Sequence, residues 1–327
     1  MLAHHEPLAP KLGLFVADFD DTLTRSDSTP LLPLIAATCR PSQKQHITLA
    51  WEALTDAFVT GYYGAIREHL SQPKEGARLE DLETFLVALE AVETSSIERV
   101  TESKVLAGMT PAAIAQTLEG PLQGMWGPRD AHVARCLARV LSATSCAHHI
   151  ISINFSEIVV RTVLRGLLGA AAEDGGSAHA AAAADALTVH CNTLALGADG
   201  ATTGEVTMDV VGGRGKLRRF RALRAESAGG GGATMYIGDS VTDLLPMLSA
   251  DIGIVLGNSG TFKEVAAAFG IDIVPLGRVL DGAAPVQIAP AGDDGVGSGT
   301  SPLGRTVYHA ESWLEIEHLL FGKVEYD

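Results

Sequence analysis

Three aspartates in one short segment are the residues best suited to chemistry. In LFVADFDDTLT, Asp18, Asp20 and Asp21 directly follow an apolar run, where a buried strand should end. Carboxylates this close together raise one another's pKa unless a cation or hydrogen-bond donors compensate for their charge. Because alternate residues of an extended segment share a face, Asp18 and Asp20 can point toward one site while Asp21 turns away.

Hard oxygen ligands of this kind favour magnesium over zinc, so the segment predicts a divalent-cation site. The alternative is structural: an Asp-rich turn, or a helix N-cap formed by Asp21 or Thr22. The motif alone does not decide between the two, and the rest of the chain must.

A second acidic loop lies far along the chain. The segment MYIGDSVTDLLPML places Asp239, Ser240 and Asp243 after another short apolar run, at the start of a helix. If the two strands are neighbours in one sheet, Asp239 can offer another oxygen to the cation held by Asp18. Ser240 and Asp243 also match a capping box, so Asp243 alternatively only closes a helix start. Asp239 precedes the cap, and capping explains it less well.

A serine and a lysine complete the set of candidates. Ser152 ends the apolar run of HHIISINFS, ahead of a helix whose free amides favour an anion, so its hydroxyl can donate to a phosphate oxygen. Lys216 follows the glycine-rich turn GGRGK, and an ammonium beside carboxylates can neutralise a substrate phosphate. Taken singly, each has an ordinary alternative, because serines often end strands and lone lysines are usually surface residues.

The elements that must position these side chains follow from the apolar pattern. Short apolar runs predict buried strands over residues 12–17, 150–153, 235–237, 252–256 and 271–274. Helical patterns follow several of these runs, which predicts an α/β fold with a mainly parallel sheet flanked by helices. In such sheets ligands bind beyond the carboxyl ends of the strands. From about residue 25 to about residue 145 only helical patterns occur, which predicts an inserted helical domain.

Low-complexity tracts and the last helix complete the outline. The tracts over residues 169–186, 226–233 and 281–302 predict surface loops or disorder, although the alanine-rich first tract alternatively prolongs a helix. Ser312 and Glu315 match the capping box of a last helix that ends near Phe321.

Composition limits the class of protein. The chain has 327 residues, of which 46% are hydrophobic and 19% are charged, enough for two domains with a sizeable core. Its net charge of −15 disfavours nucleic acid and anionic membrane as partners. The four cysteines are widely spaced, which predicts reduced thiols rather than a zinc ribbon. With no secretory signal and no long apolar run, we expect a cytoplasmic protein, leaving organellar targeting and oligomeric state open.

The motifs in combination resemble a known family. D-F-D-D-T, the strand-ending Ser152, Lys216 and G-D-S-V-T-D occur in the order found in the haloacid dehalogenase (HAD) superfamily of phosphohydrolases. The resemblance covers residues 12–24 and 148 to about 275. It implies a Rossmann-like core of residues 1–24 and 146–327, with an all-helical cap of residues 25–145 inserted between the first two motifs.

Two narrower likenesses refine this resemblance. The position of the cap, together with HCNTLALGADGATTGEV, is similar to the phosphoserine-phosphatase-like branch. The segments TLTRSDSTPLLPLIA and IGDSVTDLLPMLSADIGIVLGNSGTFKEVAAAFGIDIVPL are similar to the phosphatase module of plant thiamine-phosphate hydrolases. A small phosphomonoester is therefore the expected substrate, with thiamine monophosphate as the leading candidate.

The resemblance also implies roles for the acidic residues. Asp18 is expected to attack phosphorus and become an aspartyl phosphate, and Asp20 to act as general acid and base. Mg²⁺ is expected as the cofactor, held by the carboxylates of Asp18 and Asp239 and the backbone carbonyl of Asp20. Two departures stand out: position 21 is Asp where many relatives have Gly, and INFS replaces the Gly-Gly that follows the serine in phosphoserine phosphatases.

The remaining candidates are expected to bind substrate or to support the site. The resemblance implies that Thr22, Ser152 and Lys216 bind the substrate, and that Asp243 supports Lys216 or a metal-bound water. A cationic thiazolium suits a negatively charged protein whose cap carries the aromatic residues Trp51, Tyr62, Tyr63 and Trp126. These rings are alternatively cap core. The other functions considered are a phosphatase of phosphoserine or another small metabolite, a haloacid dehalogenase, which would need neither Asp20 nor magnesium, and a non-catalytic binding module.

Overall fold

A computed structural model describes residues 6–71, 79–142, 146–169, 177–227, 231–283 and 306–322. Most of the low-complexity tract over residues 281–302 lies outside the described residues, as do parts of the other two tracts. In the alanine-rich tract, helix α7 (Ser177–Ala186) is formed. The helical alternative is therefore correct for this part of the tract.

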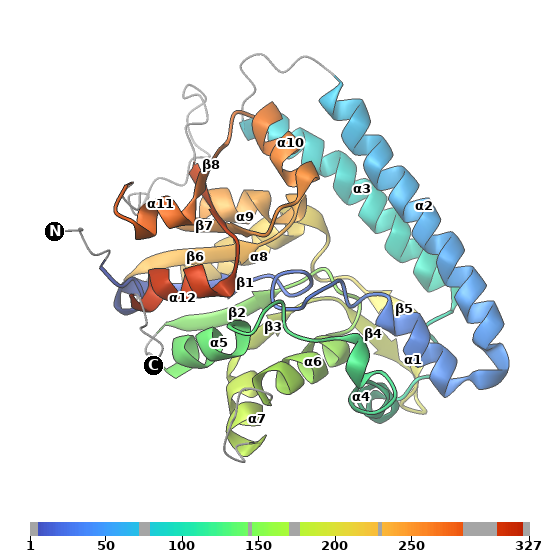
Figure 1. The fold of residues 1–327 in the computed structure, drawn as a ribbon. Coiled ribbons are helices and arrows are strands. Elements are labelled where there is room, and N and C mark those ends of the chain that lie inside the picture. Colours follow the sequence, from blue (N-terminus) through green and yellow to red (C-terminus); the bar gives the residue numbers. More distant parts are fainter. Residues whose placement is uncertain are drawn as a thin grey trace.

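A seven-stranded parallel sheet forms the centre of the molecule (Figure 1). Its strands are β1 (Leu12–Ala17), β2 (Ala147–Ile151), β3 (Thr188–His190), β6 (Ala233–Gly238), β7 (Ile252–Leu256), β8 (Asp272–Pro275) and β9 (Thr306–Ala310). Their spatial order is β3-β2-β1-β6-β7-β9-β8, and each neighbouring pair is parallel. The predicted α/β class is confirmed, and β1 and β6, which end in the two acidic loops, are neighbours.

Helices cover both faces of this sheet, which explains why its strands are almost continuously apolar. Alternate residues of β1 belong to different cores: Leu14 and Val16 to one, Phe15 and Ala17 to the other. The first core includes residues of α8 (Gly212–Ser227), α9 (Leu244–Ser249) and α10 (Gly260–Ala268). The second core includes residues of α5 (Val133–Ser142), α6 (Glu157–Gly169), α11 (Leu276–Leu280) and α12 (Trp313–Phe321).

Between β1 and β2 the described regular elements are all helices, joined by turns and loops. They include α1 (Leu31–Cys39), α2 (Lys44–Leu70), α3 (Leu79–Ser103), α4 (Pro111–Glu119) and α5. The long helices α2 and α3 lie side by side at the periphery of the molecule, and α3 also packs on α8 of the core (Figure 1). Helix α5 packs on α6 and α12 of the core, so we propose that the cap ends before α5. The sequence analysis places this boundary at residue 145, after α5, and that boundary stays a prediction.

Sequence patterns missed the short strands. β3 and β9 were not predicted, nor was the antiparallel pair β4 (Thr193–Leu196) and β5 (Thr202–Thr207). The last helix is present, but the Ser312 side chain does not cap it, and the Glu315 carboxylate accepts from the Glu311 amide instead. Among the helices that the structure describes, none is both long enough and apolar enough for a membrane span.

Candidate active site

The two acidic loops meet at one edge of the sheet. β1 and β6 pair in parallel through Ala17 and Ile237, and the Asp18 amide donates to the Ile237 carbonyl at 2.8 Å. Because parallel strands end at the same edge, Asp18 and Asp239 follow directly beyond this pairing. One carboxylate oxygen from each of Asp18, Asp239 and Asp243 lies within 4.8 Å of the others. Residues more than 200 positions apart therefore form one acidic cluster.

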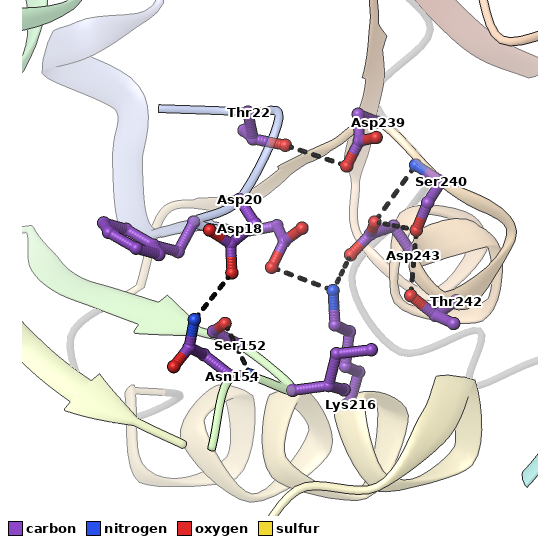
Figure 2. A network of polar contacts seen from close by, with 12 residues as sticks. Asp18, Asp20, Thr22, Ser152, Asn154, Lys216, Asp239, Ser240, Thr242 and Asp243 are labelled. Carbon is purple, nitrogen blue, oxygen red and sulfur yellow. Dashed lines mark hydrogen bonds and ion pairs between the residues drawn. The ribbon is translucent and has the colours of Figure 1, made fainter. Parts of the chain in front are cut away.

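Lys216 lies inside this cluster. Its Nζ is 2.9 Å from Oδ1 of Asp18 and 2.7 Å from Oδ1 of Asp243, and its side chain is 1% exposed (Figure 2). It comes from the first turns of α8, which packs against β1. Burial alone lowers the pKa of Lys216, but the two carboxylates outweigh burial and raise it. The ammonium therefore stays charged at neutral pH.

One ammonium does not balance three carboxylates. Burial and the Asp243 charge raise the pKa of Asp18 well above its ordinary value, although Lys216 opposes the shift. Burial and Asp243 likewise raise the pKa of Asp239 to about 7. A divalent cation would offset the repulsion between these carboxylates and would favour their ionised forms. The donor set therefore fits magnesium: it consists of hard oxygens with an excess of negative charge.

Asp243 has two structural roles at once. Its Oδ1 accepts from Lys216 and from the Tyr236 hydroxyl, at 2.7 and 2.8 Å. Its Oδ2 accepts from the amide and hydroxyl of Ser240, at 3.2 and 2.9 Å, and the bond from the amide is part of a capping box. Since both Asp243 oxygens are already engaged, Asp18 and Asp239 are the better ligands for a cation.

Asp20 is held separately from the acidic cluster. Its Oδ1 accepts from the Ser28 amide at 2.7 Å. Its Oδ2 accepts from Nδ2 of Asn154 at 3.0 Å, a bond that Figure 2 shows. Burial is the main cause that raises the pKa of Asp20 to about 7, and the charge of Asp27 adds to this shift. The hydrogen bonds from Asn154 and Ser28 oppose the shift. A carboxyl group that titrates near neutrality can both donate and accept a proton. Among the described residues, the cluster of carboxylate oxygens consists of Asp18, Asp239 and Asp243 and does not include Asp20.

The sequence analysis did not identify Asn154 and Ser28 as site residues. Asn154 is the second residue after Ser152 and also donates to the Ser28 hydroxyl at 3.0 Å, so it joins the loop after β2 to the segment after β1. The signal was visible, because Asn154 belongs to the INFS segment that departs from the expected Gly-Gly.

Thr22 and Ser152 are both buried at the same edge. The Thr22 hydroxyl donates to Oδ1 of Asp239 at 3.3 Å, and its carbonyl accepts from the indole N–H of Trp313 at 2.8 Å. Ser152 follows β2 directly, and its Oγ accepts from the Asn154 amide at 3.1 Å. In the part of the chain that the structure describes, the Ser152 hydroxyl hydrogen has no acceptor, and it is available to a phosphate oxygen.

The backbone at Asp21 adopts a left-handed conformation. Its φ is 55°, in the left-handed region, and its carbonyl accepts from the guanidinium of Arg129. Glycine adopts this conformation without strain, and Asp is one of the side chains that tolerate it. Asp21 is therefore compatible with the same turn that a glycine at this position would form.

Comparison with known proteins identified relatives along nearly the whole chain. No protein-family model matches it. It is 27% identical to the bifunctional TH2 protein, mitochondrial, of Arabidopsis thaliana, over 94% of this chain and 49% of that protein. It is 22% identical to a CTO1 family protein of Schizosaccharomyces pombe, over 93% of this chain and 98% of that protein. The chain thus spans about half the length of the plant relative.

Solved structures with a similar arrangement include two of phosphoserine phosphatase. A substrate-bound complex has a TM-score of 0.47 and 15% identity, over 78% of this chain and 90% of that chain. A phospho-aspartyl intermediate analogue has a TM-score of 0.46 and 15% identity, over 78% and 91%.

Proposed function

We propose that this chain, which resembles the haloacid dehalogenase superfamily in its sheet, its motif order and its acidic site, is a phosphomonoester hydrolase. The observation that carries the proposal is the buried Lys216 ammonium between Asp18 and Asp243, with Asp20 held apart by its own donors. Phosphoryl transfer depends mainly on positioning and on neutralising charge, and this site supplies both.

The proposed reaction has two steps. A carboxylate oxygen of Asp18 attacks phosphorus, the bond from phosphorus to the leaving oxygen breaks, and Asp20 protonates that oxygen. Asp20 then takes a proton from water, whose oxygen attacks phosphorus and releases phosphate and the Asp18 carboxylate. Lys216 and the Ser152 hydroxyl hold the phosphoryl oxygens.

Mg²⁺ is the proposed cofactor. Asp18, Asp239 and the backbone carbonyl of Asp20 would hold it, and it would neutralise charge on the phosphoryl group. Its support is the cluster of oxygens within 4.8 Å and the raised pKa values of Asp18 and Asp239.

Thiamine monophosphate is the leading candidate substrate. Its support is the resemblance of the segments after the first motif and around G-D-S-V-T-D to plant thiamine-phosphate hydrolases. A phosphatase of phosphoserine or another small metabolite is the alternative. The cytoplasmic location stays a prediction, and the plant relative is named as mitochondrial.

The test is hydrolysis of p-nitrophenyl phosphate by the purified protein. We expect turnover with Mg²⁺, loss of turnover with EDTA, and recovery when excess Mg²⁺ is returned. Absence of turnover with Mg²⁺, Mn²⁺ or Co²⁺ would instead favour a non-catalytic binding module. A panel of metabolite phosphates that includes thiamine monophosphate and phosphoserine then identifies the substrate.

A further inference from the structure

Two histidines lie side by side outside the acidic site. Nδ1 of His149 on β2 is 3.2 Å from Nε2 of His190 on β3. The centroids of the two rings are 5.3 Å apart, and the ring planes are inclined by 30°. The proposed reaction uses neither side chain, so this histidine pair is a candidate site of its own.

The sheet fixes the position of the histidine pair. β2 and β3 are parallel, with His149 opposite Thr188 and His190 opposite Ile151. Ile151 belongs to the core that α8 covers, and alternate residues of a strand share a face, so both histidines lie on that face. β3 is an edge strand (Figure 1), and both histidines are half-buried. The rings are therefore held together at a place that ions from solvent can reach.

His148, the preceding residue of β2, has different surroundings. Its Nε2 is 3.1 Å from the Val140 carbonyl of α5, which covers the opposite face of the sheet. His148 is half-buried like its neighbour, but it does not belong to the histidine pair.

The spacing of the two nitrogens fits a shared metal ion. An imidazole nitrogen binds zinc at about 2.0–2.1 Å, so two of them on one tetrahedral ion lie about 3.3 Å apart. The observed 3.2 Å needs no movement of either strand. The alternative is a hydrogen bond between the rings, for which one of the two nitrogens must carry a hydrogen. A metal ion requires both nitrogens to be free of hydrogen.

The charges around the histidine pair do not oppose a cation. Arg219 and Arg161 both act on His190, but each has a carboxylate partner. Arg219 donates to the two oxygens of Asp209 at 2.7 and 2.8 Å, and Arg161 donates to Glu157 at 2.6 Å. Burial is the main cause that lowers the pKa of His190 to about 4 and lowers that of His149. Both imidazoles are therefore neutral at pH 7, the form that binds metals.

Imidazole nitrogens suit zinc, copper and nickel, whereas magnesium prefers oxygen ligands. We propose that His149 and His190 bind a divalent transition-metal ion, at a site separate from the acidic cluster. Among the described residues, the one group of three or more possible ligands within 4.8 Å is the acidic cluster, so water would complete the coordination of this second ion.

The proposed ion would join an edge strand to the centre of the sheet. β3 has only three residues, and the His190 carbonyl accepts from the Ser152 amide at 2.9 Å. A metal bridge between His149 and His190 would therefore also hold the start of the segment that contains Ser152. This inference goes beyond the proposed function and does not depend on it.

Calorimetric titration of the untagged protein with Zn²⁺ tests the proposal, with Mg²⁺ in large excess to occupy the acidic cluster. We expect His149→Gln and His190→Gln each to weaken Zn²⁺ binding at least about tenfold, the lower end of the loss when even a hydrogen bond to a ligand is removed. The matched control is His148→Gln, which should keep the wild-type affinity. Asp239→Asn should keep it too, because the acidic cluster is a different site.

Electron paramagnetic resonance of bound Cu²⁺ reports the ligands directly. The double variant His4→Gln, His5→Gln removes the other adjacent histidines of the chain that lie near its start. In this protein we expect coupling of Cu²⁺ to two nitrogens, and to one nitrogen when His149→Gln or His190→Gln is added.

Two results overturn the proposal: a Zn²⁺ affinity that is equal in wild type, His149→Gln and His190→Gln, or a Cu²⁺ spectrum with fewer than two nitrogens. The histidine pair would then be only a hydrogen bond between strands. If circular dichroism shows that a histidine variant does not fold, the Cu²⁺ spectrum of the His4→Gln, His5→Gln protein decides. None of these measurements uses turnover, so their failure and the failure of the proposed function are distinguishable.

Discussion

Lys216 is the residue that allows three carboxylates to lie together. It forms ion pairs with Asp18 and Asp243 and lowers the pKa of Asp18, whereas burial and the Asp243 charge raise that pKa. Lys216 contacts Oδ1 of Asp18, and we propose that the other oxygen attacks phosphorus. Asp18 and Asp20 have different partners, so their proposed roles can be tested separately.

Asp18→Asn tests the nucleophile. An amide oxygen is a poor nucleophile, so we expect kcat to fall by at least about a thousandfold while the fold is kept. Hydrolysis of p-nitrophenyl phosphate measures the loss, and circular dichroism checks the fold. Substantial magnesium-dependent turnover in a folded variant would rule out Asp18 as the nucleophile.

Asn154→Ala tests the control of Asp20. The Asn154 side chain donates to Asp20 and thereby lowers its pKa, so its removal should raise that pKa above its value of about 7. The limb of the kcat profile that reports Asp20 should move to higher pH by about one unit, as expected for one hydrogen bond to a charged group. A lower rate with an unmoved limb would mean that Asn154 contributes only to structure.

The sequence revealed site residues unevenly, for a physical reason. Asp18 and Asp239 are visible because acid directly after an apolar run is costly without a compensating partner. Asn154 stands out in the sequence only as part of the INFS departure, and its contacts with Asp20 and Ser28 join segments far apart in the chain. Sequence spacing contains no record of such contacts.

Among the elements, cap helix α3 and core helix α8 pack together around a buried carboxylate that has no hydrogen-bond partner among the described residues. Glu93 lies at this contact, and burial is the main cause that raises its pKa to about 8. Elements were predicted well where the apolar run was long, as in β1 and β7. β3 has only three residues, and β5 alternates buried and exposed positions, so neither gave a continuous apolar run.

Glu93→Gln should stabilise the protein in a manner that depends on pH. From about pH 4.5 to about pH 8 the unfolded carboxyl ionises while the folded one keeps its proton, so wild-type stability falls with rising pH. Glutamine cannot ionise and avoids this loss. Denaturant unfolding at pH 5 and pH 8.5 should show an advantage of the variant that grows by about 1 kcal/mol or more.

A constant difference between the two proteins across this range would show that Glu93 is not held protonated. The matched control is Glu98→Gln, the same substitution at an exposed position of the same helix.

At the scale of the whole molecule, the acidic site links strands from distant parts of the chain. A cation that binds the folded state and not the unfolded one stabilises the entire fold by mass action. We therefore expect Mg²⁺ to raise the melting temperature, and Asp239→Asn to abolish most of that rise. Thermal unfolding with and without Mg²⁺ measures the effect.

Asp56→Asn, an exposed change on α2, should keep the full response to Mg²⁺. An equal response in the Asp239 and Asp56 variants would place the stabilising cation elsewhere in the protein.

The hydrogen bond from Trp313 to the Thr22 carbonyl has a consequence for synthesis on the ribosome. Trp313 at the start of helix α12 anchors the segment that follows Asp18. When the ribosome has synthesised both acidic loops, Trp313 has not yet been added to the chain. The newly made protein should therefore acquire full activity only after residue 313 has emerged from the ribosome.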